Sequence, residues 1–261
     1  MNNKSPLRYP GGKTRACKIL DDILNTHFDI SDYECILSPF FGGGSFEFYL
    51  QNKYNLDIIA NDKFTPLFHF WKTCKHENNN LTNTLTKYID CIDKETFANM
   101  RSTIMNTTNI FHQSVLYFII NRCSFSGSTL SGGFSFESSK KRFTQSSIDK
   151  IQNLNLSNFE IYNLDFEEFL NQHIHDKYIL FLDPPYYLEQ KSKLYGNNGD
   201  MHEDFDHEKL FNCISKRKKW IMTYNNCDYI KNLYKDFHII ETNWSYGMNK
   251  SKESSEIVII G

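Results

Sequence analysis

Glu34–Asp62 reads ECILSPFFGGGSFEFYLQNKYNLDIIAND and decides the fold of the chain. We predict a short buried strand at Glu34–Leu37, a helix over roughly residues 45–52 and a second strand at Leu56–Ala60. A strand, a turn, a helix and another strand in this order imply two parallel strands joined by a right-handed crossover. The segment therefore predicts an open α/β sheet.

The turn after the first strand is rich in glycine and leads into a helix. Gly42-Gly43-Gly44 would let a ligand approach the backbone closely beside the helix N-terminus. Asp62 follows Gly42 by twenty positions, the spacing of an acid that accepts ribose hydroxyl groups in a nucleotide-binding unit. Together these features predict a nucleotide-like ligand, although a plain tight turn and a helix N-cap would use the same residues.

The rest of the chain divides into further sheet and an insertion. Additional strands are expected at residues 158–162, 178–182, 219–223, 237–242 and 256–260. Residues 77–121 instead read as helices only, and residues 123–139 read as a long loop or a hairpin rich in Ser, Gly and Phe. We therefore predict a catalytic domain formed by residues 1–72 and 145–261, with a lobe inserted at residues 73–144.

A second strand end carries a distinct set of polar groups. Leu180–Tyr187 reads LFLDPPYY, so a buried apolar strand ends in Asp183-Pro184-Pro185-Tyr186. Active sites of open α/β sheets lie beyond the carboxyl ends of the strands. The prolines remove backbone donors and leave carbonyl acceptors. Acceptors that converge beside an aromatic ring suit a planar NH₂ group; a rigid turn with a capping Asp is the structural alternative.

Composition limits the class of protein. A chain of 261 residues that is 40% hydrophobic fits one large α/β domain, or a catalytic core with a small inserted lobe. The N-terminus has no apolar region typical of a signal peptide, and the apolar runs are too short to span a bilayer. The seven cysteines form no C-x-x-C pair, which argues against a disulfide framework or a zinc site. We expect no metal and a cytoplasmic location, in the host if the chain is phage-encoded.

The net charge of −2 is distributed unevenly. Six basic and only two acidic residues lie between Arg101 and Lys150. A second basic run, Lys216–Lys219, closes a predicted helix and is more simply a solvated helix end. A nucleic-acid partner would therefore meet the inserted lobe.

Pro10-Gly11-Gly12-Lys13-Thr14 ends like a phosphate-binding P-loop but does not match one. The first glycine of a P-loop would fall at Leu7, and no apolar strand precedes the segment. We therefore assign no phosphate binding to it, and a Gly-Gly turn that opens a helix stays possible.

The order of these motifs resembles the Dam-like, D12-class α group of N6-adenine DNA methyltransferases, from Leu7 to the last strand. The resemblance implies a Rossmann-like α/β sheet, mostly parallel with one antiparallel strand, and an inserted, mainly helical target-recognition lobe. It also implies S-adenosylmethionine as cofactor. The cofactor-binding residues that it implies are Tyr9, Pro10, Gly11, Gly12, Lys13, Pro39, Phe40, Phe41, Gly42, Gly44, Ser45, Asp62, Asp165 and Phe166.

The resemblance assigns catalysis to Asp183, Pro184, Pro185 and Tyr186. The lone pair of adenine N6 is delocalised into the ring, so it must be directed at the methyl carbon. We expect Asp183 and the Pro184 carbonyl to accept hydrogen bonds from the NH₂ group and to stabilise the charge that develops on it. Tyr186 would stack on the base, which must be flipped out of the duplex to be reached.

The DNA contacts expected from the family and from the basic insert lie in and beside the lobe. They are Arg8, Arg122, Phe125, Ser126, Gly127, Lys140, Lys141 and Arg142. Phe125 would wedge into the base stack, and Lys140, Lys141 and Arg142 suit phosphates. Dam enzymes specific for GATC carry an arginine a few residues past the glycine, where this chain has Leu130. We therefore assign no target sequence.

The expected partners are double-stranded DNA and S-adenosylmethionine, with no membrane. The family expectation is a monomer, and a cognate restriction endonuclease is a possible partner. Two alternatives stay open. One is another amino-group methyltransferase, which acts on cytosine N4, RNA adenine or protein glutamine; the other is a DNA-binding protein that has lost catalysis.

Overall fold

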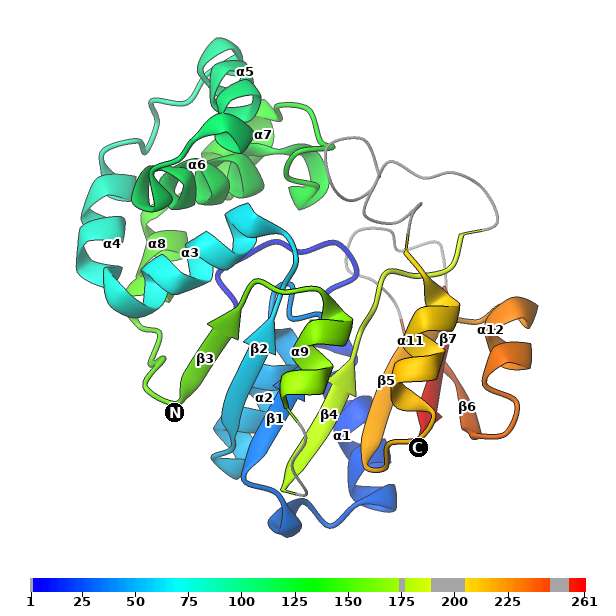
Figure 1. Cartoon of the computed structure of the whole chain (residues 1–261). Coiled ribbons are helices and arrows are strands. Elements are labelled where there is room, and N and C mark those ends of the chain that lie inside the picture. The colour runs from blue at the N-terminus through cyan, green and yellow to red at the C-terminus, as the bar shows by residue number, and fades with distance from the viewer. Residues whose placement is uncertain (1, 174–176, 189–204, 245–253) are drawn as a thin grey trace.

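The computed structural model describes residues 2–173, 177–188, 205–244 and 254–261 (Figure 1). Its strands form one seven-stranded sheet in the order β3-β2-β1-β4-β5-β7-β6. The strands are β1 (Cys35–Ser38), β2 (Asp57–Asn61), β3 (Phe159–Tyr162), β4 (Tyr178–Leu182), β5 (Trp220–Asn225), β6 (His238–Trp244) and β7 (Ser254–Ile260). The strand β7 runs antiparallel to both of its neighbours, β5 and β6, while the other four strand pairs of the described sheet are parallel. The predicted mostly parallel sheet with one antiparallel strand is confirmed.

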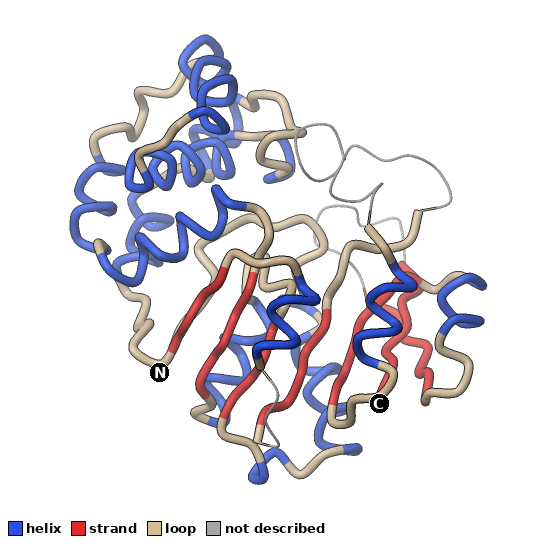
Figure 2. The backbone as a smooth tube through the Cα atoms, in the orientation of Figure 1, coloured by secondary structure: helices blue, strands red, loops and turns tan. Residues whose placement is uncertain are grey.

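Helices cover both faces of the sheet (Figures 1 and 2). The helices α1 (Cys17–His27) and α2 (Ser45–Tyr54) lie on one face. The helices α9 (Phe166–Gln172) and α11 (His207–Ile214) lie on the other, and α12 (Asp228–Leu233) stands near the β6 edge. This layering requires strands that are apolar on both sides, as parallel strands usually are.

The side chains of β1 show how the two faces are filled. Ile36 belongs to the buried cluster that contains Leu20 of α1 and Phe46 of α2. The next residue, Leu37, belongs to the cluster that contains Leu210 of α11. Successive side chains of a strand point to opposite faces, so a continuous apolar run buries both. This explains why the strand reads as a hydrophobic run and not as an alternating one.

Helices between β2 and β3 form the inserted region. They are α3 (Thr65–His76), α4 (Asn78–Thr86), α5 (Lys94–Thr103), α6 (Ile110–Cys123), α7 (Phe136–Lys141) and α8 (Gln145–Gln152). Every residue of α6 from Gln113 to Cys123 is buried, because α3, α4, α5 and α7 pack around it. The helix α8 packs on α4, although it lies beyond the boundary expected at residue 144. The domain boundaries stay a prediction.

The region expected to be a loop or a hairpin is partly helical. Ser124 and Phe134 form an antiparallel bridge, so the turn between them is hairpin-like. The helix α7 begins at Phe136, and the Ser135 hydroxyl oxygen accepts a hydrogen bond from the Ser138 N–H at 3.1 Å. Serine favours caps and turns over helix interiors, which is why the serine-rich sequence hid this short helix.

The N-terminal segment passes between the inserted helices and the carboxyl edge of the sheet (Figure 1, dark blue). Its first anchor is Asn3, which is buried. The Asn3 Nδ2 atom donates to Gln51 Oε1 and to the carbonyl oxygen of Asn155, each at 2.7 Å. The segment is therefore held between α2 and the chain that leaves α8.

The described residues include neither a helix that could cross a bilayer nor a group of three or more side chains that could hold a metal ion. All seven cysteines carry free thiols. Most of these thiols are buried in the core, where they pack as small apolar groups.

The packing of β7 gives a test of the fold. Ile259 is fully buried, and its partners in the register are Met222 of β5 and Ile239 of β6. We expect Ile259→Ala to lower the free energy of unfolding by about 2–5 kcal/mol, because the cavity that it leaves cannot collapse between paired strands. Urea unfolding measures this. Ile19→Ala, at an exposed position on α1, should change stability by less than about 0.5 kcal/mol; equal losses would contradict the packing.

Candidate active site

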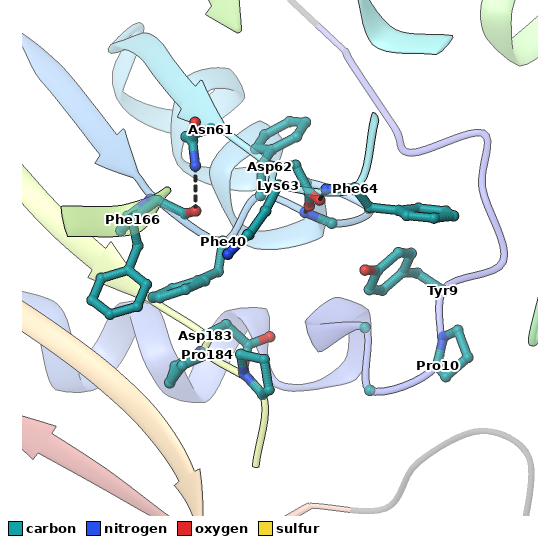
Figure 3. Close-up of a pocket in the computed structure, with 18 of the residues that line it drawn as sticks. Tyr9, Pro10, Phe40, Asn61, Asp62, Lys63, Phe64, Phe166, Asp183 and Pro184 are labelled. Carbon is teal, nitrogen blue, oxygen red and sulfur yellow. Dashed lines mark hydrogen bonds between the residues drawn. The ribbon is translucent and has the colours of Figure 1, made fainter. Parts of the chain in front are cut away.

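A cavity of about 890 Å³ lies beyond the carboxyl ends of β1, β2 and β4. Its volume is near the upper end for small-molecule sites. Every residue predicted to bind the cofactor or to act in catalysis lines it. Figure 3 shows Tyr9 and Pro10 on one side, Phe40 and Phe166 opposite, and Asp183 below. None of the eight predicted DNA contacts lines the cavity.

The glycine-rich turn is shaped by two aromatic rings. Gly42 and Gly44 have positive φ angles of 51° and 64°. A Cβ atom on Gly42 would lie 2.8 Å from Cε1 of Tyr9, and one on Gly44 would lie 2.3 Å from Cζ of Phe41. The Trp71 Nε1–H donates to the Gly42 carbonyl at 3.0 Å. The turn therefore needs glycine for its backbone angles and for space.

Asp62 closes the turn from the end of β2. Its Oδ2 accepts the Gly42 N–H and its Oδ1 accepts the Phe64 N–H, both at 2.9 Å. Burial raises the pKa of Asp62 to about 6, although both hydrogen bonds act in the opposite direction. The carboxylate thus fixes the turn, and its remaining lone pairs are free to meet a ligand in the cavity, which Asp62 lines.

Aromatic side chains form a wall near the start of α9. The rings of Phe40 and Phe166 lie 5.7 Å apart between centroids, and Phe205 lies 5.4 Å from Phe166. Asp165 caps α9, and it forms an ion pair with Lys63 at 3.0 Å. The wall is apolar with a carboxylate at its rim, which suits a flat heterocycle with amino groups.

Asp183 is held by two partners that the sequence did not reveal. The Lys13 ammonium lies 2.8 Å from Asp183 Oδ1, and it also donates to the Gly11 carbonyl at 2.9 Å. The Thr223 hydroxyl on β5 donates to Asp183 Oδ1 at 2.6 Å. Lys13 is almost fully buried, so this ion pair sits in a site of low polarity. The pair links the N-terminal segment to the loop after β4.

The ring of Tyr186 is also fixed. Its hydroxyl donates to Glu256 of β7 at 2.6 Å, and its ring lies 6.0 Å from that of Tyr224. Burial, and then the negative charges of Asp183 and Glu256, hold the pKa of Tyr186 well above its usual value. Tyr186 therefore stays a neutral donor, and Lys13 lies 5.1 Å from its ring centroid.

Glu47 is a buried acid of the cavity that sequence reasoning missed. It accepts a hydrogen bond from the Ser38 hydroxyl at 2.6 Å and is only 2% exposed. Burial raises its pKa to about 7. Its place three residues after Gly44, in the first turn of α2, was the available signal.

The predicted DNA contacts fall into two groups. Phe125 is 69% exposed, so its ring projects from the surface, whereas Gly127 two residues later is buried. Arg122, in contrast, is buried. Its Nε donates to the Arg142 carbonyl at 2.7 Å and its Nη1 to the Pro6 carbonyl at 3.2 Å. In this position Arg122 supports the backbone and does not present its guanidinium to a ligand directly.

The other basic residues differ in their partners. The Arg8 Nη1 donates to the Ser124 carbonyl at 3.3 Å and to the Ser138 hydroxyl at 3.1 Å. Lys140 pairs with Asp90, and Lys141 pairs with Glu137, in both cases on the surface. Exposed pairs of this kind contribute little and exchange readily for other anions.

Two comparisons with known proteins agree with this geometry. Residues 9–248 match the family described as D12 class N6 adenine-specific DNA methyltransferase. The chain is also 25% identical over 263 residues to the type II methyltransferase M.MjaIII of Methanocaldococcus jannaschii. That alignment covers 92% of this chain and 90% of the relative.

The raised pKa of Glu47 predicts a pH-dependent stability. A carboxyl whose folded pKa is raised contributes stability below its unfolded pKa and loses it as the pH rises through about 7. Relative to the native protein, Glu47→Gln should therefore gain roughly 3 kcal/mol in free energy of unfolding between pH 4 and pH 8. Urea unfolding across this range measures the difference. Glu95→Gln, at an exposed position on α5, is the control; parallel curves for all three proteins would contradict the assignment.

Proposed function

The chain belongs to the D12 class N6 adenine-specific DNA methyltransferase family, and on this premise we propose that it transfers the methyl group of S-adenosylmethionine to N6 of an adenine flipped out of duplex DNA. One observation carries the proposal. Asp183 and Tyr186, which would hold the base, line the same cavity as the residues that would hold the cofactor. A volume of about 890 Å³ leaves room for both.

The chemistry of the lining residues fits this cofactor part by part. Asp62 offers carboxylate oxygens to ribose hydroxyl groups, while it keeps its bonds to the Gly42 and Phe64 N–H groups. Phe40 and Phe166 would hold the adenine ring by its faces and edges. The charged methionine end would then lie toward Gly11 and Lys13, where buried charges of both signs are present.

When bound, the cofactor supplies an electrophilic methyl group on a sulfonium sulfur. Asp183 and the Pro184 carbonyl would accept hydrogen bonds from the adenine NH₂ group, so that the N6 lone pair points at the methyl carbon. In this transfer the bond from N6 to the methyl carbon would form as the carbon–sulfur bond breaks, with S-adenosylhomocysteine as the leaving group, and the extra proton on N6 would pass to water. Acceptors that are fixed before the reaction stabilise the positive charge that develops on N6.

Lys13 and Thr223 act on this step through Asp183. Both donate to the carboxylate, so its orientation is set before the base arrives. The hydroxyl of Tyr186 is anchored by Glu256, so its ring would be held in place for the flipped base to stack on. An incoming amino group must share Asp183 with Lys13.

A basic cluster, defined as Lys4, Arg8, Arg122, Arg142 and Lys150, supports DNA as the partner. None of the five forms an ion pair with a carboxylate among the residues that the structure describes. Burial, and then the neighbouring cations, lower the pKa of Arg8, Arg122 and Lys150. Cations held together without an ion-paired carboxylate create a positive potential, which suits the phosphate backbone. Lys4 and Lys150 were not among the predicted DNA contacts.

The relative M.MjaIII is named a type II methyltransferase. We propose that this chain likewise belongs to a restriction–modification system, in which methylation would protect the DNA of the cell from a cognate endonuclease. Recovery of an endonuclease that cleaves only unmethylated copies of the same site would test this role.

Methylation is tested by expressing the chain in cells that lack adenine methylation and sequencing plasmid DNA with a methyl-sensitive method. We expect N6-methyladenine within one short motif. Asp183→Asn should lower the rate by about 10²–10³-fold, because it removes the charged acceptor. It should still bind S-adenosylhomocysteine within a few-fold of the native affinity.

Thr223→Val is the matched variant of this experiment. It removes only the hydroxyl that orients Asp183, so we expect a smaller loss of rate, of about tenfold. Methyl transfer to cytosine, RNA or protein in place of adenine in DNA would overturn the proposed substrate. A native rate in Asp183→Asn would overturn the mechanism.

The basic cluster predicts the salt dependence of DNA binding. Lys4→Gln with Lys150→Gln should lower the slope of log K against log salt by roughly 1–2, because each phosphate contact contributes about 0.9. Fluorescence anisotropy with any labelled duplex measures the slope. Lys216→Gln with Lys218→Gln, at exposed positions before the amino end of β5, is the control. Equal slopes for the two double variants would remove the cluster from the DNA contacts.

A further inference from the structure

Asn121, near the end of α6, pairs with the backbone just before the cofactor segment. It is fully buried. Its Oδ1 accepts the Arg8 N–H at 3.0 Å, and its Nδ2 donates to the Arg8 carbonyl at 2.8 Å. The side chain therefore satisfies both backbone groups of Arg8, as a neighbouring strand would.

The same amide also holds the exposed turn. We call residues 124–130 the reader loop, since they carry Phe125 and lead to Leu130. The Asn121 Nδ2 lies 3.3 Å from the Gly127 carbonyl oxygen and 3.2 Å from Thr129 Oγ1. One buried side chain thus joins residue 8 to the reader loop, more than a hundred positions along the chain.

A second contact fixes the two segments independently of Asn121. Gly127 has a φ angle of 72° and lies against Arg8. A Cβ atom on Gly127 would approach both the Cβ and the carbonyl oxygen of Arg8 to 2.6 Å. The loop cannot shift toward the N-terminal segment without moving it.

Both the N-terminal segment and the reader loop extend from Asn121 to the cavity. Tyr9, which follows Arg8, packs its ring on Gly42 of the glycine-rich turn. Thr129 and Leu130 of the reader loop line the cavity. Packing therefore fixes the loop that would meet DNA and the segment that would meet the cofactor relative to each other.

We propose that Asn121 is a positioning residue that couples DNA binding at the reader loop to cofactor binding at Tyr9–Lys13. The inference rests on the proposed function for the identity of both ligands. Either ligand stabilises one side of the Asn121 pairing and so favours the arrangement that the other requires. Such coupling is reciprocal, so that each ligand raises the affinity for the other by the same factor.

The test is Asn121→Asp, which keeps the size of the side chain and an acceptor for the Arg8 N–H. It removes both N–H donors and sets an oxygen against the Arg8 and Gly127 carbonyls. We expect the Kd for S-adenosylhomocysteine, measured by calorimetry without DNA, to rise about tenfold. Without these hydrogen bonds the N-terminal segment would lose its fixed position. Ligand binding would then have to order the segment, which weakens the affinity.

Gln113→Glu is the matched control. Gln113 is a buried amide on the same helix, and its Nε2 donates to the Ile104 carbonyl at 2.7 Å. The change also sets a carboxylate against a carbonyl, but it touches neither Arg8 nor the reader loop. It should lower the melting temperature as Asn121→Asp does, and leave the Kd for S-adenosylhomocysteine unchanged.

Gly127→Ala tests the coupling from the loop side if Asn121→Asp does not fold, and the same rise in Kd is expected. With a labelled duplex, saturating S-adenosylhomocysteine should tighten DNA binding by native protein and not by Asn121→Asp. An unchanged Kd in both variants, or an equal rise in Gln113→Glu, overturns the coupling. Native protein that binds no S-adenosylhomocysteine would overturn the proposed function itself.

Discussion

The direct pairing of β1 with β4 is the constraint on which the site depends. Because these parallel strands are hydrogen-bonded neighbours, the glycine-rich turn after β1 and Asp183 after β4 emerge at the same edge of the sheet. The strand β2 pairs with β1 on its other side and brings Asp62 to that edge as well. The chain order reverses at this point, and open α/β sheets form their ligand sites there.

Buried charge is the second feature that shapes the site. Lys13, Asp62 and Glu47 are all less than 10% exposed, yet each has a polar partner that fixes it. Burial disfavours isolated charges, so such groups persist where their partners are in place. The site is thus ordered before any ligand enters, which favours catalysis by preorganised acceptors.

The N-terminal segment gives the inserted helices their relation to the sheet. It is tied to α2 through Asn3, to α6 through Arg8, and to the loop after β4 through Lys13. Few of these hydrogen bonds belong to a helix or to strand pairing. Side chains supply the hydrogen-bond partners that a neighbouring strand would otherwise offer. These side-chain contacts hold the reader loop and the cavity together.

The sequence by itself determined the strands, the turns and the predicted cofactor and catalytic residues that line the cavity, but not the buried acid Glu47 among them. Those signals are local, because apolar runs, Gly-Gly-Gly and Asp-Pro-Pro-Tyr constrain the backbone within a few residues. The family resemblance supplied the roles of Tyr9, Asp165 and the reader loop. It did not reveal that α7 begins inside the serine-rich stretch, since serine alone favours a turn or a cap.

Only the tertiary structure decided which polar groups meet. Lys13 and Asp183 are 170 residues apart, Tyr186 and Glu256 are 70 apart, and Arg8 and Asn121 are 113 apart. No local pattern specifies such pairs, because they depend on strand order and on how the inserted helices pack. For the same reason the sequence predicted Arg122 as a DNA contact, whereas its guanidinium points inward and donates to backbone carbonyls.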